Sequence, residues 1–149
     1  MSYSEKISDD LMQAMKDKQK DLLEALRAVK TAFTLERSSK GAGSILTSEE
    51  EIRIMQKLVK QRKESAAIYS EQGRQDLADK ELFEAECIEK YLPEQMSEEQ
   101  IAEYISGIIR ETGASGLKDM GKVMGRATKE LAGKADGKTI SAIVKKQLS

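Results

Sequence analysis

The chain has 149 residues, of which 39% are hydrophobic and 4% are aromatic, and it contains a single proline. This composition favours aliphatic helices over short strands, so we expect an all-α fold. The 25 basic and 26 acidic side chains nearly cancel, so the chain as a whole has no strong attraction for polyanions or acidic membranes. The absence of histidine excludes histidine-dependent catalytic triads and most zinc and haem sites.

Two helices and a loop are expected first. Ser4 caps the first helix, whose apolar stripe consists of Ile7, Leu11 and Met15. Asp21 caps the second helix, which ends near Arg37 and has a stripe of Leu22, Leu26, Val29 and Phe33. Residues 38–44 are small and polar, which predicts a flexible loop.

Two further helices follow this loop. Thr47 and Glu50 have the spacing of a capping box at the start of the third helix, and Gly73 ends it. The fourth helix begins at Gln75 and ends before Pro93. Its apolar positions are Leu77, Leu82, Ala85, Ile88 and Leu92, with Phe83, Cys87 and Tyr91 alongside. Cys87 is therefore expected to pack in the core rather than to react.

Composition changes at Pro93. Three glycines lie in residues 1–106 and seven lie in residues 107–149. We therefore expect two domains: an N-terminal helical, hairpin-like domain at residues 1–93 and a compact three-helix domain at residues 97–149.

Three helices are expected in the second domain. Ser97 and Gln100 form a capping box for the first, which ends at Gly113. The second ends at Gly133 and the third is capped by Asp136. Their apolar positions are Ile101, Ile105 and Ile108, then Leu117, Met120, Val123, Met124, Ala127 and Leu131, then Ile140, Ile143, Val144 and Leu148.

Charge is concentrated in the last part of the chain. Residues 115–149 hold eight basic and three acidic side chains, a net charge of +5. Lys122, Arg126 and Lys129 are spaced i, i+4, i+7 and so share one helical face. A phosphate backbone can dock on such a face. The alternative is the ordinary solvated face of an amphipathic helix.

Two glycines interrupt the same helix. Gly121 and Gly125 each cost about 1 kcal/mol relative to alanine inside a helix, so a compensating gain is expected. Glycines at this spacing allow close approach, either by a neighbouring helix or by a ligand surface such as an RNA sugar-phosphate edge. The turn at residues 136–138, which contains Lys138, either caps the last helix or exposes amides to an anion.

Cysteine usage and hydropathy indicate the cellular compartment. The single cysteine, Cys87, cannot form an internal disulfide, which favours a reducing environment. The first residues lack a signal-peptide pattern, and the longest apolar run, residues 66–69, is too short to span a membrane. We therefore expect a cytoplasmic protein without membrane association.

Independent enzyme activity is not expected. The sequence contains no nucleotide-binding loop, dinucleotide fingerprint, paired-cysteine motif or zinc-protease motif. Glutamates could bind a metal in a helical bundle, but such sites usually include histidine; the candidates are Glu81, Glu84, Glu86 and Glu89. We therefore expect no catalytic residue, no metal and no cofactor.

Several motifs resemble one family. In the second domain these are DMGKVMG at 119–125, GKADGK at 133–138 and IVK at 143–145. In the first domain they are KQRKESA at 60–66, GRQDLA at 73–78 and YLPEQMS at 91–97. The chain resembles stand-alone YqeY-like proteins of the GatB/YqeY family, and its second domain resembles the tail of the tRNA amidotransferase B subunit.

The resemblance implies a function in tRNA recognition. In the amidotransferase the tail contacts the outer body of tRNA, whereas the catalytic body that performs glutamine-dependent carbon-nitrogen ligation has no counterpart here. The positions that match the tail motif are Gly121, Lys122, Gly125, Asp136, Gly137 and Lys138. Arg126 and Lys129 fall on its variable part, so their role rests on charge alone. The expected nucleic-acid contacts are Gly121, Lys122, Gly125, Arg126, Lys129 and Lys138.

Two other functions remain open. One is a protein-interaction adaptor for a tRNA-modifying or aminoacylating enzyme, with the long helices of the first domain as the docking face. The other is an auxiliary enzyme acting on amide groups, which has only the family label in its favour.

Overall fold

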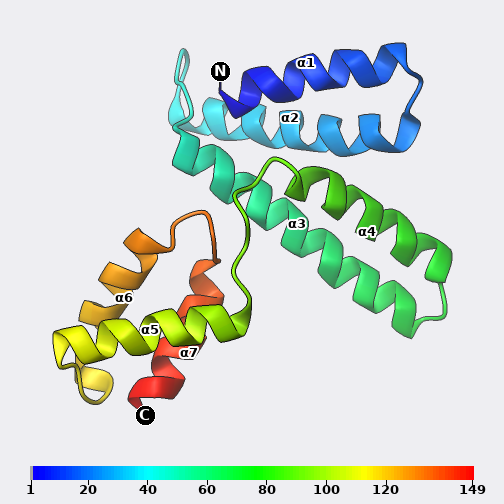
Figure 1. Ribbon diagram of the computed structural model, residues 1–149. Helices are drawn as coiled ribbons and strands as arrows, with labels where there is room; N and C mark the ends of the chain where they lie inside the picture. Colours follow the sequence, from blue (N-terminus) through cyan, green and yellow to red (C-terminus); the bar gives the residue numbers. More distant parts are fainter. Residues whose placement is uncertain (1) are drawn as a thin grey trace. The chain divides into compact units, whose positions relative to one another are not determined.

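The computed structural model describes residues 2–149, and within them the chain is all-helical, as the sequence predicted. The chain divides into two compact units. Unit 1 extends to Leu92, and unit 2 comprises Pro93–Ser149. Figure 1 shows the helices of each unit in chain order, and the two units are described separately below.

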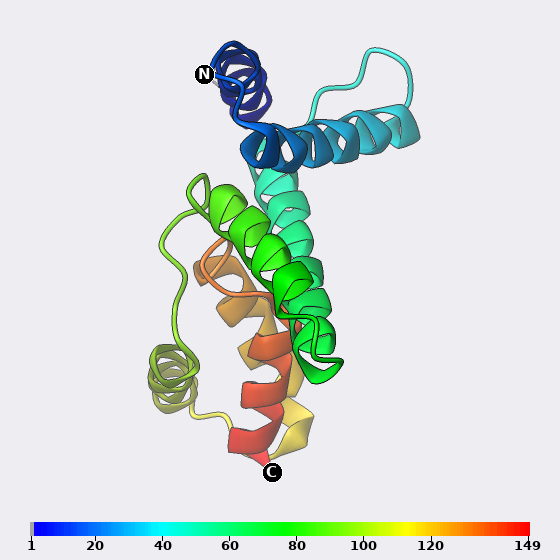
Figure 2. The same ribbon diagram turned by 90° about the vertical axis from the view of Figure 1, so that its right-hand side faces the viewer.

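Unit 1 contains two helical hairpins (Figures 1 and 2). The first pairs α1 (Tyr3–Lys16) with α2 (Lys20–Lys40), and the second pairs α3 (Ser48–Glu71) with α4 (Gln75–Glu89). Helix α2 also packs against α3 and α4, and so joins the hairpins.

Local signals explain most helix ends in unit 1. Thr47 caps α3 in the predicted box: its hydroxyl accepts from the Glu50 amide at 3.1 Å, and the Glu50 carboxylate accepts from the Thr47 amide at 3.0 Å. Gly73 follows α3 in the left-handed conformation, with φ of 74°. Three predictions were wrong by a few residues. Ser2, not Ser4, caps α1. Helix α2 begins at Lys20, so Asp21 lies in its first turn and does not cap it, and α2 continues to Lys40 through part of the predicted loop.

The core of unit 1 draws on all four helices. Its largest fully buried side chains are Ile7, Leu26, Phe33, Met55 and Ile88. Cys87 is buried, as predicted, and burial raises the pKa of its thiol.

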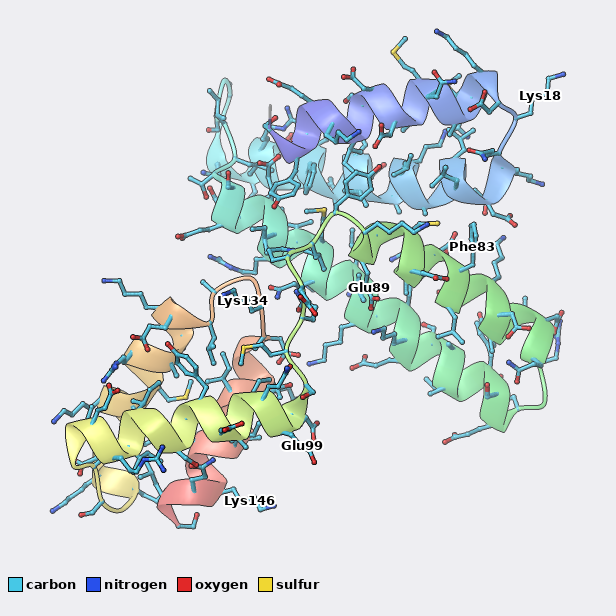
Figure 3. The ribbon with its side chains drawn as sticks, viewed as in Figure 1. Lys18, Phe83, Glu89, Glu99, Lys134 and Lys146 are labelled. Carbon is cyan, nitrogen blue, oxygen red and sulfur yellow. The ribbon has the colours of Figure 1, made fainter. Side chains whose placement is uncertain are left out.

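Three predicted core positions are exposed instead. Met15 is 51% exposed, and Ala14 fills the corresponding core position. Leu82 and Phe83 are also exposed, and Figure 3 shows Phe83 on the outer side of α4. The buried face of α4 is rotated towards Ala78, Ala85 and Ile88, because it must contact both α2 and α3.

Buried polar contacts also hold unit 1 together. The Glu51 carboxylate is 1% exposed and accepts from the Ser4 amide at 2.7 Å, which fixes the start of α1 against α3. The Tyr91 hydroxyl donates to Asp10 at 2.5 Å. Burial and this hydrogen bond raise the pKa of Tyr91 above its ordinary value, so the phenol keeps its proton further into alkaline solution than a free tyrosine does.

Unit 2 contains α5 (Glu98–Thr112), the 3₁₀ helix η1 (Leu117–Asp119), α6 (Met120–Glu130) and α7 (Gly137–Leu148). The predicted Ser97–Gln100 capping box is present, and Gly113 ends α5 with φ of 67°. All three α-helices contribute to one core, whose buried members are Ile101, Ile105, Ile108, Val123, Ala127, Leu131, Ile140, Val144 and Leu148.

The sixth predicted helix is shorter than expected. Residues 117–119 form the 3₁₀ helix, and Leu117 is 52% exposed rather than buried. Gly116 precedes this turn in a left-handed conformation, with φ of 75°, which redirects the chain before α6 starts.

The residues just before Ser97 are attached to unit 2. The Met96 amide donates to the Lys134 carbonyl at 2.9 Å, and the Gln95 side-chain amide donates to the Gly133 carbonyl at 2.7 Å. Figure 3 shows Lys134 in the loop between α6 and α7. Unit 2 therefore includes residues N-terminal to the predicted start at 97.

Candidate nucleic-acid interface

Helix α6 has two distinct faces. Val123 and Ala127 are fully buried against α5 and α7. At 100° per residue, Gly121, Gly125, Lys129 and Lys122 all lie within one arc of about 100°, on the side away from these buried residues. All four are exposed. We call these four residues the α6 strip.

The two glycines of the α6 strip face open space. A β-carbon added at Gly121 or at Gly125 would meet no described atom within 4 Å. Neither glycine has a positive φ, so backbone conformation does not require glycine here. Close packing of a neighbouring helix, one of the two predicted explanations, is therefore not what the glycines provide inside unit 2. The glycines instead leave a stretch of bare helical backbone at the surface.

Arg126 lies at the edge of the α6 strip and has acidic partners. Its Nε atom lies 3.2 Å from the Glu130 carboxylate, and its guanidinium also pairs with Glu111 of α5. These hydrogen bonds raise the pKa of Arg126 above its ordinary value. The three predicted cations therefore differ in their surroundings. Arg126 links α6 to α5, whereas Lys122 and Lys129 belong to the α6 strip and are exposed.

Lys138 lies apart from the α6 strip, at the second position of α7. The Asp136 carboxylate caps this helix by accepting from the Thr139 amide at 2.7 Å. The helix start is therefore occupied by a carboxylate of the chain itself, which favours the capping interpretation of this turn over an anion site. The side chain of Lys138 is exposed.

The glutamates considered as metal ligands have other partners. Glu84 is buried and lies 3.5 Å from Arg62, and Glu89 pairs with Lys63 on the side of α4 that faces α3 (Figure 3). Burial raises the pKa of Glu84 above its usual range. Among residues 2–149, no group of three or more cysteine, aspartate or glutamate side chains is arranged to hold a metal ion.

The sequence patterns did not predict a groove on the surface of unit 1. A groove of about 430 Å³ lies between α2 and α3, and its lining includes Leu35, Ile54 and Leu58. Leu35 is 67% exposed and falls outside the apolar stripe of α2. In the sequence, the groove is indicated only by Leu35, an apolar residue off the apolar face of α2. Single exposed leucines are common and do not by themselves identify a site.

Comparison with known proteins agrees with the motifs. The family model for Yqey-like proteins matches residues 4–148, which is nearly the whole chain. A relative from Pyrenophora tritici-repentis, altered inheritance of mitochondria protein 41, mitochondrial, is 28% identical over 132 residues, covering 87% of this chain and 71% of the relative. The uncharacterized protein C22F3.15 of Schizosaccharomyces pombe is 29% identical over 91 residues, which cover 61% of this chain and 72% of that relative.

Helix hydropathy adds a further observation. Within residues 2–149, each helix is too short or too polar to cross a bilayer. The family match spans both units, all of α1 to α7 apart from the first residue of α1, and the motifs on which the resemblance was based. The chain therefore belongs to the family of YqeY-like proteins.

Proposed function

We propose that unit 2 binds RNA, and specifically the sugar-phosphate backbone of tRNA, through the α6 strip. The observation that supports this proposal is the open glycine surface: a β-carbon at Gly121 or Gly125 would meet no other element of unit 2 within 4 Å, yet a glycine inside a helix, as at Gly125, costs about 1 kcal/mol relative to alanine. A close-fitting external ligand would repay that cost. The resemblance of the DMGKVMG motif to the amidotransferase tail indicates which RNA to test first.

The chemistry of the strip suits recognition by shape. Bare backbone at the two glycines lets a ribose edge approach the helix closely. Lys122 and Lys129 lie along one side of it and supply charge to adjacent phosphates. Aromatic side chains are absent from the strip, so we propose no base stacking and little sequence readout. This function is binding, without a catalytic step of its own.

The test is binding of the full chain to a mixed tRNA pool at two salt concentrations. Lys122→Gln combined with Lys129→Gln is expected to weaken binding to every tRNA species. The salt slope should also fall by about 0.7–0.9 for each phosphate that the two lysines no longer neutralise. Arg126 is left intact because its loss would leave Glu111 and Glu130 without their partner.

A matched control separates local contact from net charge. Lys145→Gln combined with Lys146→Gln removes the same charge from exposed positions of α7. The control should retain most of the affinity. If both double variants weakened tRNA binding equally, the affinity would depend only on the net charge of unit 2. That result would contradict the assignment of the site to α6.

One observation favours a second candidate function. The groove between α2 and α3 in unit 1 gives the adaptor alternative a physical docking surface. Its occupant is inferred in the next subsection.

A further inference from the structure

The groove between α2 and α3 has an apolar floor. Its apolar lining consists of Ala32 and Leu35 of α2 and Ile54 and Leu58 of α3. Ile54 and Leu58 also pack against the core of unit 1, so the floor is anchored, whereas Leu35 is 67% exposed. Figure 2 shows α2 crossing the N-terminal part of α3, with the C-terminal part of α2 extending beyond it.

Unpaired cations surround this floor. Arg53 and Lys57 line the groove itself. Arg27 and Lys30 line an adjoining hollow that shares Leu35 with the groove. Ion pairs within the described residues involve none of these four cations.

The acidic residues of the groove do not cancel this charge. Glu50 is already paired with Lys40 at 2.7 Å, which leaves Glu36 as the acidic lining residue without an ion pair inside residues 2–149. The surface therefore complements a negatively charged partner.

The groove has the dimensions of a helix-binding site. Its α3 side is formed at Glu50, Ile54, Leu58 and Gln61, which recur once per turn. Eleven residues at 1.5 Å each give a length of about 16 Å, or three helical turns. Lys40 also donates to the Ile45 carbonyl at 3.2 Å, which places the exposed Ile45 near the Glu50 end. On the α3 side, the apolar lining residues are the middle two of these four, Ile54 and Leu58.

We propose that this groove binds an acidic amphipathic helix of a partner protein. The partner's apolar residues, spaced i, i+3 or i+4, and i+7, contact Leu35, Ile54 and Leu58. Its carboxylates pair with Arg53 and Lys57. The apolar lining favours a protein helix over an RNA backbone, because Leu35, Ile54 and Leu58 can cover apolar side chains but offer no hydrogen bond or charge to a phosphate. This inference deepens the adaptor function and is independent of RNA binding by unit 2.

The test is selection of a displayed library of random peptides about 16 residues long on the full chain. Selected peptides are then synthesised and their affinities measured by fluorescence anisotropy. Two variants address the groove: Leu35→Ser for the floor, and Arg53→Glu with Lys57→Glu for the charge. Because Leu35 is exposed and neither cation has an ion pair among the described residues, both variants are expected to fold, and circular dichroism checks this.

Matched controls lie elsewhere on unit 1. Phe83→Ser removes an exposed apolar side chain from α4 (Figure 3), and Lys16→Glu with Lys90→Glu reverses two exposed charges. The expected result is enrichment of acidic peptides with helical apolar spacing, whose affinity falls at least tenfold in both groove variants and less than twofold in both controls. Nuclear magnetic resonance shifts should map to residues 53–58.

Four results would overturn the proposal. Failure to enrich any peptide above background would do so, as would peptides without the acidic, helical pattern. Peptides that bind with unchanged affinity after the groove substitutions would place the docking surface elsewhere and leave the adaptor function standing. Loss of tRNA binding in the charge variant, without loss of peptide binding, would assign Arg53 and Lys57 to nucleic acid instead.

Discussion

Gly121 and Gly125 occupy ordinary helical positions at which an alanine side chain would meet no described atom within 4 Å. Their effect on stability and their effect on binding can therefore be separated at the level of single residues. Packing in unit 2 gives no reason for glycine at either position, because each substitution leaves the core contacts of α6 unchanged.

We predict that Gly125→Ala stabilises unit 2 by about 1 kcal/mol, and that Gly121→Ala, at the second residue of α6, stabilises it by less, because alanine loses less backbone entropy inside a helix. The same substitutions should weaken tRNA binding, because a methyl group keeps the ribose edge away from the backbone. Thermal unfolding and filter binding measure the two effects. Gly107→Ala in α5 is the control: its β-carbon would meet only Arg110 at 3.9 Å, so stability should rise with affinity unchanged. Unchanged tRNA affinity in the α6 variants would remove the reason for proposing close approach.

Glu50 provides a prediction about pH. Hydrogen bonds from Lys40 and from the Thr47 backbone lower the pKa of Glu50 from 4.5 to about 2. Because the pKa is lower in the folded state, the contribution of Glu50 to stability is present above pH 4.5 and is lost as the pH falls towards 2. Carboxyl resonances followed by nuclear magnetic resonance should show this midpoint, and Lys40→Met should move it upwards. A midpoint that stays low in Lys40→Met would show that the capping box alone sets the pKa.

At the scale of the element, short local sequence patterns predict where helices begin and end, but they do not predict which face of a helix is buried. The Thr47–Glu50 and Ser97–Gln100 boxes were predictable because both partners lie three residues apart in sequence. The exposed Phe83 was not predictable, because the buried face of α4 depends on how α2 and α3 cross it. The same limit applies to the α6 strip. Its residues were named from sequence, but the pairing of Arg126 with Glu111 joins two helices and appears only in the fold.

Removing a cap should cost a definite amount of stability. Thr47→Ala and Ser97→Ala are each expected to destabilise their own unit by about 1 kcal/mol, because an amide at the helix start loses its acceptor. Denaturant unfolding measures the change. Ser48→Ala is the control for Thr47, since the Ser48 side chain makes no capping hydrogen bond within the described chain. Alanine has the higher helix propensity, so Ser48→Ala should not lower stability. A loss in Ser48→Ala equal to that in Thr47→Ala would show that the effect does not come from the cap.

At the scale of the whole molecule, the two units have separate cores. The core cluster of unit 1 ends at Ile88, and that of unit 2 begins at Ile101. Each cluster is built from helices that are consecutive in sequence. Unfolding of one unit therefore need not expose the core of the other.

We predict that Ile105→Ala destabilises unit 2 by about 2–5 kcal/mol, because it leaves a cavity at a fully buried position, and that it leaves unit 1 unchanged. Ile88→Ala should do the reverse. Hydrogen exchange read residue by residue distinguishes the two units. Loss of amide protection in both units after either substitution would show that they unfold as one cooperative body.

The hydrogen bonds made by Gln95 and Met96 have a consequence for genetic exchange. A recombination event that joined unit 2 to another protein at Ser97 would discard both residues and leave the carbonyls of Gly133 and Lys134 without these donors. A junction at Pro93 would transfer them with the helices. The segment able to move between genes as a working module therefore begins at the proline, a few codons before the first helix that it carries.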